Sequence, residues 1–156
     1  INLFGLKLIL DMLKSILPVV ILNQINLFET QGAIQFFALL FVIGHCYPIY
    51  NKFKGGKGVA TGIGPLVIIF FPSSLTALIV FVVTILFSRY VSLSSILGCI
   101  FAFASMVLFN IFNLFDSSYF DLIYIIPAVT IIIYKHKENI SRLIDNNENK
   151  LSFKKI

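Results

Sequence analysis

The residues with the clearest chemistry lie in one stretch, 44–62, which reads GHCYPIYNKFKGGKGVATG. It contains five of the nine glycines, and three lysines fall within six residues, at Lys52, Lys54 and Lys57. Glycines allow several backbone N–H groups to face one point, and lysines surround that point with positive charge. This pattern predicts a site for a phosphate or another small oxyanion. The alternative is a flexible basic loop that acts only as a topology signal.

The arrangement of the glycines favours the anion site. Gly55, Gly56 and Gly58 surround Lys57, so the backbone can approach an oxyanion closely. A helix that begins near Val59 would direct its positive end toward the same place. The loop is not a Walker A motif, because the GxxxxGK[ST] spacing is absent and no strand precedes it.

A second polar cluster follows the last apolar run. His136, Asn139 and Arg142 recur every three residues, so on a helix they lie on roughly one face. That face would carry an imidazole, an amide and a fixed cation. Arg142 could bind a phosphate bidentately, and the set could donate hydrogen bonds to developing negative charge. The alternative is an interfacial amphipathic helix whose cations contact anionic lipid.

Three weaker features have polar groups beside apolar runs. Asp11 and Lys14 lie on the first run, where charges usually face the bundle interior. They form either a structural ion pair or a substrate contact. Ser92 begins a cluster of hydroxyls that either lines a polar cavity or caps a helix. His45 ends a helix and could simply satisfy its last carbonyls. No metal-binding HExxH motif, Ser-His-Asp order or paired carboxylates occur, which disfavours covalent and metal-based mechanisms.

The elements that position these residues are apolar. The chain has 156 residues, is 58% hydrophobic and only 12% charged, and has a mean hydropathy of +0.97. Such a chain cannot cover its apolar surface with polar residues, so we expect an all-α polytopic transmembrane helix bundle. The net charge of +5 does not indicate nucleic-acid binding, because the basic residues lie beside apolar runs; anionic lipid or phosphorylated substrates fit better.

Six helices are predicted from the apolar runs, and the third is the shortest. It is interrupted by Gly62, Gly64 and Pro65, so we expect it to begin or break inside the membrane. The predicted ranges are 3–23, 31–48, 58–71, 74–88, 92–111 and 118–134.

Lysine and arginine sort the connections between these helices onto two sides. The 52–57 loop, Arg89 and the segment from Lys135 onward hold ten of the twelve basic residues, whereas 72–74 and 110–117 hold none. Cytoplasmic loops carry such an excess, so we expect the three basic segments on the cytoplasmic side. The glycine-lysine loop and His136 would then lie at the same face of the membrane and could meet.

These motifs resemble those of a known family. The stretch Gly44-His45-x-x-Pro48 followed by 53–61, and His136-x-x-Asn139-Ile140-x-Arg142-Leu143 with Glu148 and Lys150, are similar to the signatures of the bacterial PlsY-type acyl-phosphate:glycerol-3-phosphate acyltransferases. Asp11-x-x-Lys14 and 89–93 also stand where that family has similar pieces. Tyr47, Ser15 and Asn146 depart from its usual Phe, Gly and Gly. The resemblance covers essentially the whole chain.

The resemblance implies an enzyme of phospholipid biosynthesis. Its family is a bundle of seven transmembrane helices in the bacterial inner membrane, with the active site toward the cytoplasm. It transfers a fatty acyl group from acyl phosphate to the 1-hydroxyl of glycerol 3-phosphate, giving lysophosphatidic acid, without a cofactor. We expect residues 1–156 to form one domain that ends in a basic segment, 135–156. The first helix and first cytoplasmic loop of the family would be missing, so this chain could be inactive alone.

The resemblance and the two polar clusters together suggest roles for individual residues. We expect Lys57, His136 and Asn139 to be catalytic. His136 is the side chain best suited to accept the hydroxyl proton near neutral pH, and the substrate phosphate is the alternative acceptor. The expected phosphate-binding residues are Gly55, Gly56, Gly58, Lys54, Thr61, Arg142, His45 and Ser92. The alternative function is a small transporter or channel for phosphorylated or anionic solutes, and a noncatalytic membrane scaffold is a third possibility.

Overall fold

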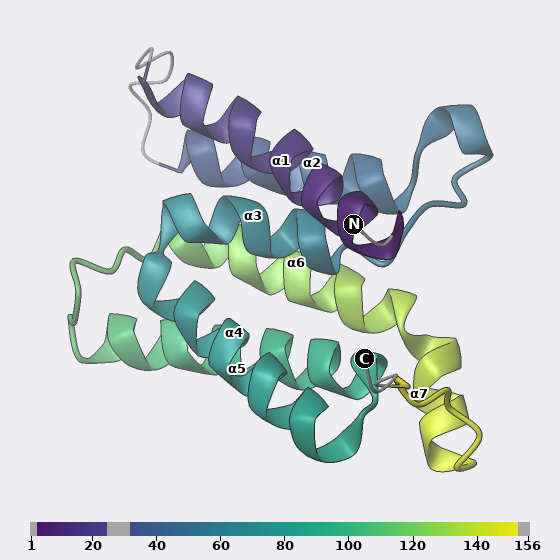
Figure 1. Ribbon diagram of the computed structural model, residues 1–156. Helices are drawn as coiled ribbons and strands as arrows, with labels where there is room; N and C mark the ends of the chain where they lie inside the picture. Colours follow the sequence, from purple (N-terminus) through teal and green to yellow (C-terminus); the bar gives the residue numbers. More distant parts are fainter. Residues whose placement is uncertain (1–2, 25–31, 153–156) are drawn as a thin grey trace.

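The computed structural model describes residues 3–24 and 32–152 of the chain, and all regular structure in these residues is helical (Figure 1). The expected all-α bundle is therefore confirmed. One 3₁₀ turn, Ile49–Asn51, follows the second helix. The α-helices are α1 (Leu3–Gln24), α2 (Ala33–Cys46), α3 (Val59–Ile69), α4 (Phe71–Ser88), α5 (Val91–Ile111), α6 (Asp121–Lys135) and α7 (Lys137–Ile144).

Helices α1 to α6 match the six predicted apolar runs, with differences at their ends. Pro72, Ser73 and Ser74 were expected in a connection but form the first turn of α4, where a proline is tolerated because its missing N–H would have no helical partner. Helix α6 begins at Asp121 rather than at 118, because the Asp121 carboxylate accepts the Ser118 N–H in a turn before the helix.

The third helix is short, as predicted, but unbroken. Its 11 residues continue through Pro65 and end at Ile69, and Phe70 is the single residue between α3 and α4. At about 1.5 Å per residue, α3 is roughly half as long as a bilayer core is thick. The expected break therefore lies after the helix and not at its glycines.

The length and composition of the helices fit a membrane protein. In the described part of the chain, three segments are long and apolar enough to cross a bilayer: 33–51, 71–88 and 91–111. Large apolar side chains such as Leu86 and Phe101 are exposed on these helices, as expected of surfaces that face lipid.

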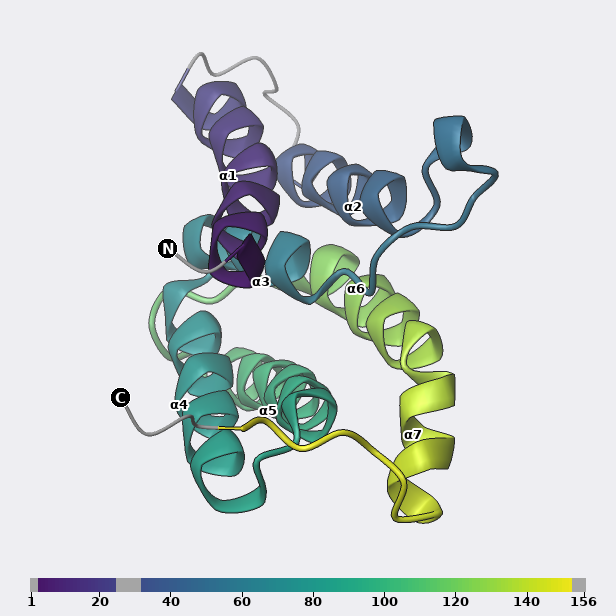
Figure 2. The ribbon, with the colours of Figure 1, turned by 45° about the vertical axis from the view of Figure 1, so that its right-hand side comes forward.

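The connections between the helices lie at the two ends of the bundle in the arrangement that the basic residues predicted. Figures 1 and 2 show the connections from α2 to α3 and from α4 to α5 at the same end of the bundle as α7. The connection between α5 and α6 lies at the opposite end. The glycine-lysine loop and the segment that contains His136 thus share one end of the bundle.

Helix α3 lies inside the bundle, in contact with α1, α2, α4 and α6. Close packing explains its glycines. A Cβ at Gly64 would lie 2.7 Å from the Ser15 hydroxyl oxygen on α1. On the other side, the Tyr124 hydroxyl of α6 donates a 2.5 Å hydrogen bond to the carbonyl oxygen of Gly62. The start of α3, directly after the glycine-lysine loop, is thereby fixed relative to both neighbours.

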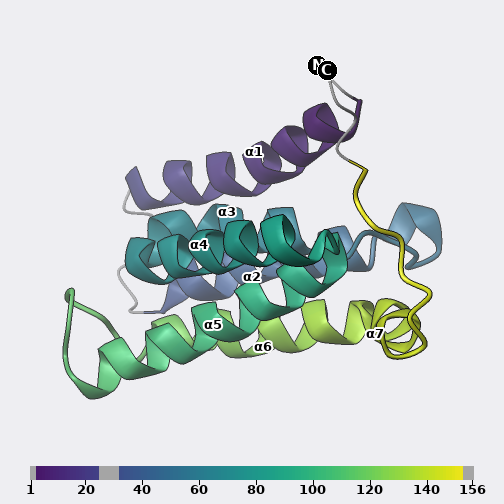
Figure 3. The same cartoon turned by 60° about the horizontal axis from the view of Figure 1, so that its bottom comes forward.

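The segment after α7 crosses the end of the bundle (Figure 3). Its Leu151 N–H donates a 2.7 Å hydrogen bond to the carbonyl oxygen of Arg89, the residue between α4 and α5. The Lys150 ammonium lies 5.4 Å from the centre of the Tyr90 ring, within the range of a cation–π contact. These contacts bring the end of the described chain to the first turn of α5.

Candidate functional site

The glycine-lysine loop lies against the C-terminal end of α2. The Gly56 N–H donates a 3.2 Å hydrogen bond to the carbonyl oxygen of His45. A Cβ at Gly55 would lie 2.1 Å from that oxygen, and a Cβ at Gly56 would lie 2.1 Å from His45 Nε2. Packing against His45 therefore requires glycine at both positions, which the sequence did not reveal. In this conformation the Gly56 N–H is occupied and does not face an anion.

The loop ends at Gly58, which precedes the first residue of α3. Gly58 has φ +84°, a conformation that favours glycine, and a Cβ there would lie 2.8 Å from Cys46 Sγ. No side chain caps α3, so its first N–H groups remain available for an anion. Thr61 is fully buried, and its hydroxyl donates to the Gly58 carbonyl oxygen at 3.2 Å. Thr61 thus supports the first turn of the helix from inside.

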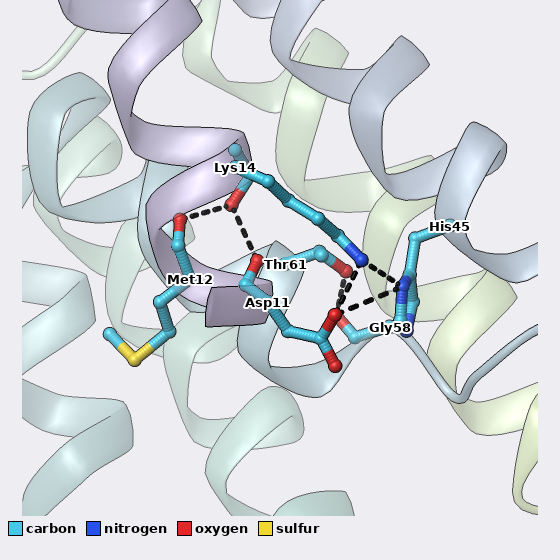
Figure 4. Close-up of polar contacts among 7 residues, drawn as sticks. Asp11, Met12, Lys14, His45, Gly58 and Thr61 are labelled. Atoms are coloured by element: carbon cyan, nitrogen blue, oxygen red, sulfur yellow. Dashed lines mark hydrogen bonds and ion pairs between the residues drawn. The ribbon is translucent and has the colours of Figure 1, made fainter. Parts of the chain in front are cut away.

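Asp11, Lys14 and His45 form a polar cluster between α1 and α2 (Figure 4). The Lys14 ammonium pairs with the Asp11 carboxylate and lies 2.8 Å from His45 Nδ1. The Asp11 and His45 side chains are 19% and 13% exposed, whereas the Lys14 side chain is 48% exposed, so the cluster reaches from the bundle interior to its surface. The predicted ion pair is present, and it includes a histidine that belongs to the glycine-lysine loop motif.

Glu148 is the centre of the second cluster. Its Oε1 accepts hydrogen bonds from Ser92 Oγ at 2.9 Å and Asn139 Nδ2 at 2.8 Å. Its Oε2 accepts one from Arg142 Nε at 2.8 Å. The Glu148 side chain is only 8% exposed, whereas that of Arg142 is 43% exposed. Glu148 therefore joins three of the predicted site residues, from α5 and α7, around one carboxylate.

His136 lies at the junction of α6 and α7 and is buried. Its Nδ1 is 2.7 Å from the Ile132 carbonyl oxygen, and a carbonyl only accepts, so Nδ1 carries the proton. Desolvation lowers the pKa of His136 below its usual 6.5; the Ile132 hydrogen bond opposes this effect, and the Lys57 charge adds to it. His136 is therefore neutral near pH 7, with a basic lone pair on Nε2.

Lys57 links the loop to the second cluster. Desolvation lowers the pKa of its ammonium, the Glu148 carboxylate opposes that shift, and the Arg142 cation adds to it. Lys57 also lines a pocket of about 300 Å³ between the loop and the start of α7. The pocket is lined by Tyr47, Gly55, Gly56, Lys57, Tyr134, Lys135, Lys137 and Glu138. With three lysines against one glutamate, it is suited to an anion.

The two predicted clusters thus lie at the same end of the bundle, where the Lys57 charge lowers the pKa of His136 and the Arg142 charge lowers the pKa of Lys57. Lys54 is placed apart from them. It is exposed in the turn after the 3₁₀ helix, where the Asn51 amide donates to its carbonyl oxygen. Glu148 was named only as part of the motif that begins at His136 and was assigned no role, because nothing in local periodicity indicates that this residue folds back onto Ser92.

A family model described as "Glycerol-3-phosphate acyltransferase" matches residues 2–146 of the chain. Curated relatives have the same description. The protein of Anaplasma phagocytophilum (strain HZ) is 40% identical over 154 residues, which are 96% of this chain and 74% of the relative. That of Endomicrobium trichonymphae is 41% identical, over 96% of this chain and 72% of the relative. For Legionella pneumophila (strain Corby) the identity is 36% over 94% of this chain, but only 50% of the relative is covered.

Two solved structures are also similar. Both are crystal structures of PlsY (YgiH), described as an integral membrane glycerol 3-phosphate acyltransferase, at 32% sequence identity. The glycerol 3-phosphate form has a TM-score of 0.82 and the match covers 95% of this chain and 70% of that chain. The lysophosphatidic acid form has a TM-score of 0.81 and is covered to 72%.

Proposed function

The chain belongs to the glycerol-3-phosphate acyltransferase family, and from this premise we propose that it acylates the 1-hydroxyl of glycerol 3-phosphate with acyl phosphate as the donor, giving lysophosphatidic acid. The observation that carries the proposal is the position of Lys57. It lies two residues before the uncapped start of α3 and lines the pocket at the start of α7, and its charge acts on His136.

The reaction needs little from the protein beyond binding and alignment. Acyl phosphate is a mixed anhydride with a good leaving group. The 1-hydroxyl oxygen attacks the acyl carbonyl carbon, the bond from that carbon to the phosphate oxygen breaks, and phosphate leaves with the electron pair. The hydroxyl proton passes to a base. Holding two anions in register and stabilising the transient oxyanion supplies most of the rate enhancement.

We assign the base to His136, because the neutral imidazole has its lone pair on Nε2 while Nδ1 donates to Ile132. Lys57 balances charge on the phosphate and on the carbonyl oxygen. Asn139 and Arg142 hold glycerol 3-phosphate; the Arg142 side chain is partly exposed and uses only Nε for Glu148, which leaves its terminal nitrogens for a phosphate.

The other predicted residues have supporting roles in this proposal. Gly55 and Gly58 shape the backbone beside Lys57, and Gly56 anchors the loop to His45. Ser92 and Thr61 act through their contacts with Glu148 and Gly58. Lys54, exposed on the same loop, attracts anionic substrates to the membrane surface.

We also propose that the chain works as a single domain in the bacterial inner membrane, with this site toward the cytoplasm. The orientation is supported by the eight lysines and arginines of 52–57, 89 and 135–150, which lie in segments at one end of the bundle. Glycerol 3-phosphate, which is water-soluble, would then reach the site from the cytoplasm, and acyl phosphate, whose chain is apolar, from the inner leaflet.

The test is to incubate the purified chain in detergent with acyl phosphate and labelled glycerol 3-phosphate, and to measure lysophosphatidic acid and released phosphate in equal amounts. The Lys57→Ala variant is expected to lose transfer, and Lys52→Ala, which removes an exposed lysine of the same loop, to retain it. Lys57→Arg should restore only part of the activity, because a planar guanidinium does not replace an ammonium in a tight loop. Uptake of glycerol 3-phosphate into vesicles without any product would identify a transporter instead.

A further inference from the structure

In the cluster of Asp11, Lys14 and His45, the Lys14 ammonium contacts both of the other side chains. The Lys14 ammonium pairs with Asp11 on its own helix and reaches across to Nδ1 of His45 on α2, 2.8 Å away. Asp11 Oδ1 itself is 3.7 Å from Nδ1, beyond hydrogen-bond distance. The contact that matters for His45 is therefore the one from Lys14.

This contact determines which nitrogen of His45 carries the proton. An ammonium group has three donors and no acceptor, so the nitrogen that it contacts must be the bare one. A protonated His45 would direct an Nδ1–H toward the Lys14 ammonium, which can only donate. His45 is thus neutral, with a bare Nδ1 and a proton on Nε2.

The Nε2–H group lies at the glycine-lysine loop. Nε2 is 2.1 Å from the place that a Cβ of residue 56 would occupy, so only a glycine at that position leaves room for the imidazole. No hydrogen bond of Nε2 is found in residues 3–24 and 32–152. Within these ranges, a side-chain polar atom that is fully buried and has no hydrogen-bond partner is found at Asn110 Oδ1 alone. In the described residues His45 Nε2 is therefore a donor without a partner that is not fully buried.

We propose that Lys14 and Asp11 are positioning residues that fix His45 in the Nε2–H tautomer, and that His45 then donates from Nε2 to the substrate phosphate held at the Gly55–Gly56–Lys57 loop. The identity of that phosphate rests on the proposed function, whereas the tautomer does not. The same cluster holds the loop itself, because the Gly56 N–H is bound to the His45 carbonyl oxygen.

The two histidines of the chain make the tautomer directly testable. His136 donates from Nδ1 to Ile132 and so should have the opposite tautomer, with a bare Nε2. Nitrogen-15 NMR of the ¹⁵N-histidine-labelled chain in lipid should therefore show one neutral imidazole of each kind. Lys14→Met should abolish the Nε2–H preference of His45 and leave His136 unchanged. A wild-type His45 with Nδ1 protonated, or an unchanged His45 tautomer in Lys14→Met, would overturn the proposal.

Matched variants distinguish the effect of the Lys14 contact on the His45 tautomer from the effects of net charge and of packing. Lys7→Met removes a lysine of the same helix that acts on His45 through its charge, with no hydrogen bond between them in the described residues, and it should leave the tautomer unchanged. Lys14→Arg keeps a donor-only cation and should preserve the Nε2–H tautomer. If Lys7→Met shifts the His45 signal as strongly as Lys14→Met does, the effect is one of net charge and the positioning role is wrong.

Binding tests the role of the Nε2 donor. The affinity for glycerol 3-phosphate, measured without acyl donor, should fall about tenfold in Lys14→Met, the size of one lost hydrogen bond. His45→Gln places an amide donor near Nε2 and should retain more affinity than His45→Asn, whose shorter amide reaches only the position of Nδ1. Equal losses in Gln and Asn would refute the donor role. Normal binding and tautomers without lysophosphatidic acid would refute the proposed reaction and leave this inference standing.

Discussion

Asn139 donates a hydrogen bond to Glu148 at 2.8 Å, and this contact holds the amide of the candidate site against the segment that follows α7. Desolvation raises the pKa of the Glu148 carboxyl, but the hydrogen bonds from Arg142, Asn139 and Ser92 outweigh it, so the pKa is lowered overall. Glu148 is thus ionised at neutral pH and binds three donors. The orientation of the proposed glycerol 3-phosphate site depends on a residue that does not itself need to touch substrate.

Replacing Glu148 with Gln should therefore cost both stability and activity. The variant keeps the size of the side chain but removes its charge, and its NH₂ group faces a donor instead of accepting from one. Hydrogen bonds to charged groups contribute about 1.5–3 kcal/mol, so the thermal unfolding midpoint in detergent should fall measurably. Asp116→Asn removes an exposed charge at the opposite end of the bundle and is the matched control. Equal midpoints for the two variants would contradict the role of Glu148.

The lowered pKa of His136 predicts how stability depends on pH. Because burial keeps the folded imidazole neutral, the unfolded chain takes up this proton more readily than the folded one. The contribution of His136 is complete above pH 6.5 and is lost as the pH falls through the lower folded pKa. Urea unfolding between pH 7.5 and 5 should show this loss, and His136→Gln should reduce it.

The same variant tests the assignment of the base. If His136 accepts the hydroxyl proton, His136→Gln should lower kcat by about 10²-fold or more, the usual contribution of general base catalysis. The KM for glycerol 3-phosphate should change less than kcat, because Gln can still donate a hydrogen bond. Full turnover in His136→Gln would show that the substrate phosphate takes its own proton.

Gly56 should not tolerate a methyl group. The Cβ of Gly56→Ala would lie 2.1 Å from His45 Nε2, so either the imidazole or the loop must move. We expect the KM for glycerol 3-phosphate to rise at least about tenfold, since a displacement of about 1 Å can cost more than that. Gly44→Ala is the control, because nothing lies within 4 Å of its Cβ and alanine favours the helix. Activity kinetics of both variants give the comparison.

Gly58 and Cys46 should be energetically coupled. Gly58→Ala brings a Cβ to 2.8 Å from Cys46 Sγ and also forces alanine to φ +84°. Cys46→Ala should relieve the contact but not the backbone strain, which costs about 1–2 kcal/mol. The double variant is thus expected to unfold at a higher temperature than Gly58→Ala and at a lower one than Cys46→Ala. Strict additivity of the two changes would show that the sulfur contact has no cost.

Much of the fold followed from patterns that are local in sequence. Apolar runs predicted α1 to α6. The spacing of His136, Asn139 and Arg142 placed these three residues on one helix; Asn139 and Arg142 lie in α7, and His136 directly precedes it. Basic residues gave the alternation of the connections, because a lysine or arginine needs no partner to indicate its side of a membrane. The start of α4 was predicted at 74 because 72–74 was assigned to a connection, although Pro72 is compatible with a first turn.

Contacts between distant residues were not predictable in the same way. Nothing in the sequence near Lys14 indicates that its ammonium meets His45, and nothing near Glu148 indicates Ser92. The glycines give a second example of a contact that could not be predicted. Gly55 and Gly56 were interpreted as anion ligands, whereas the structure adds a steric requirement from the carbonyl and imidazole of His45. A glycine pattern specifies close approach but not the group that approaches.

The path of residues 145–152 across the bundle end has a consequence for the order of events during synthesis. Helices can enter a membrane one after another as the ribosome makes them, but Ser92, Asn139 and Arg142 meet only through Glu148. A nascent chain that stops before this residue could have every apolar helix in place and still lack the arrangement of the site. Assembly of the candidate site is thereby separated from membrane insertion of α1 to α6 and depends on residues that are synthesised after them.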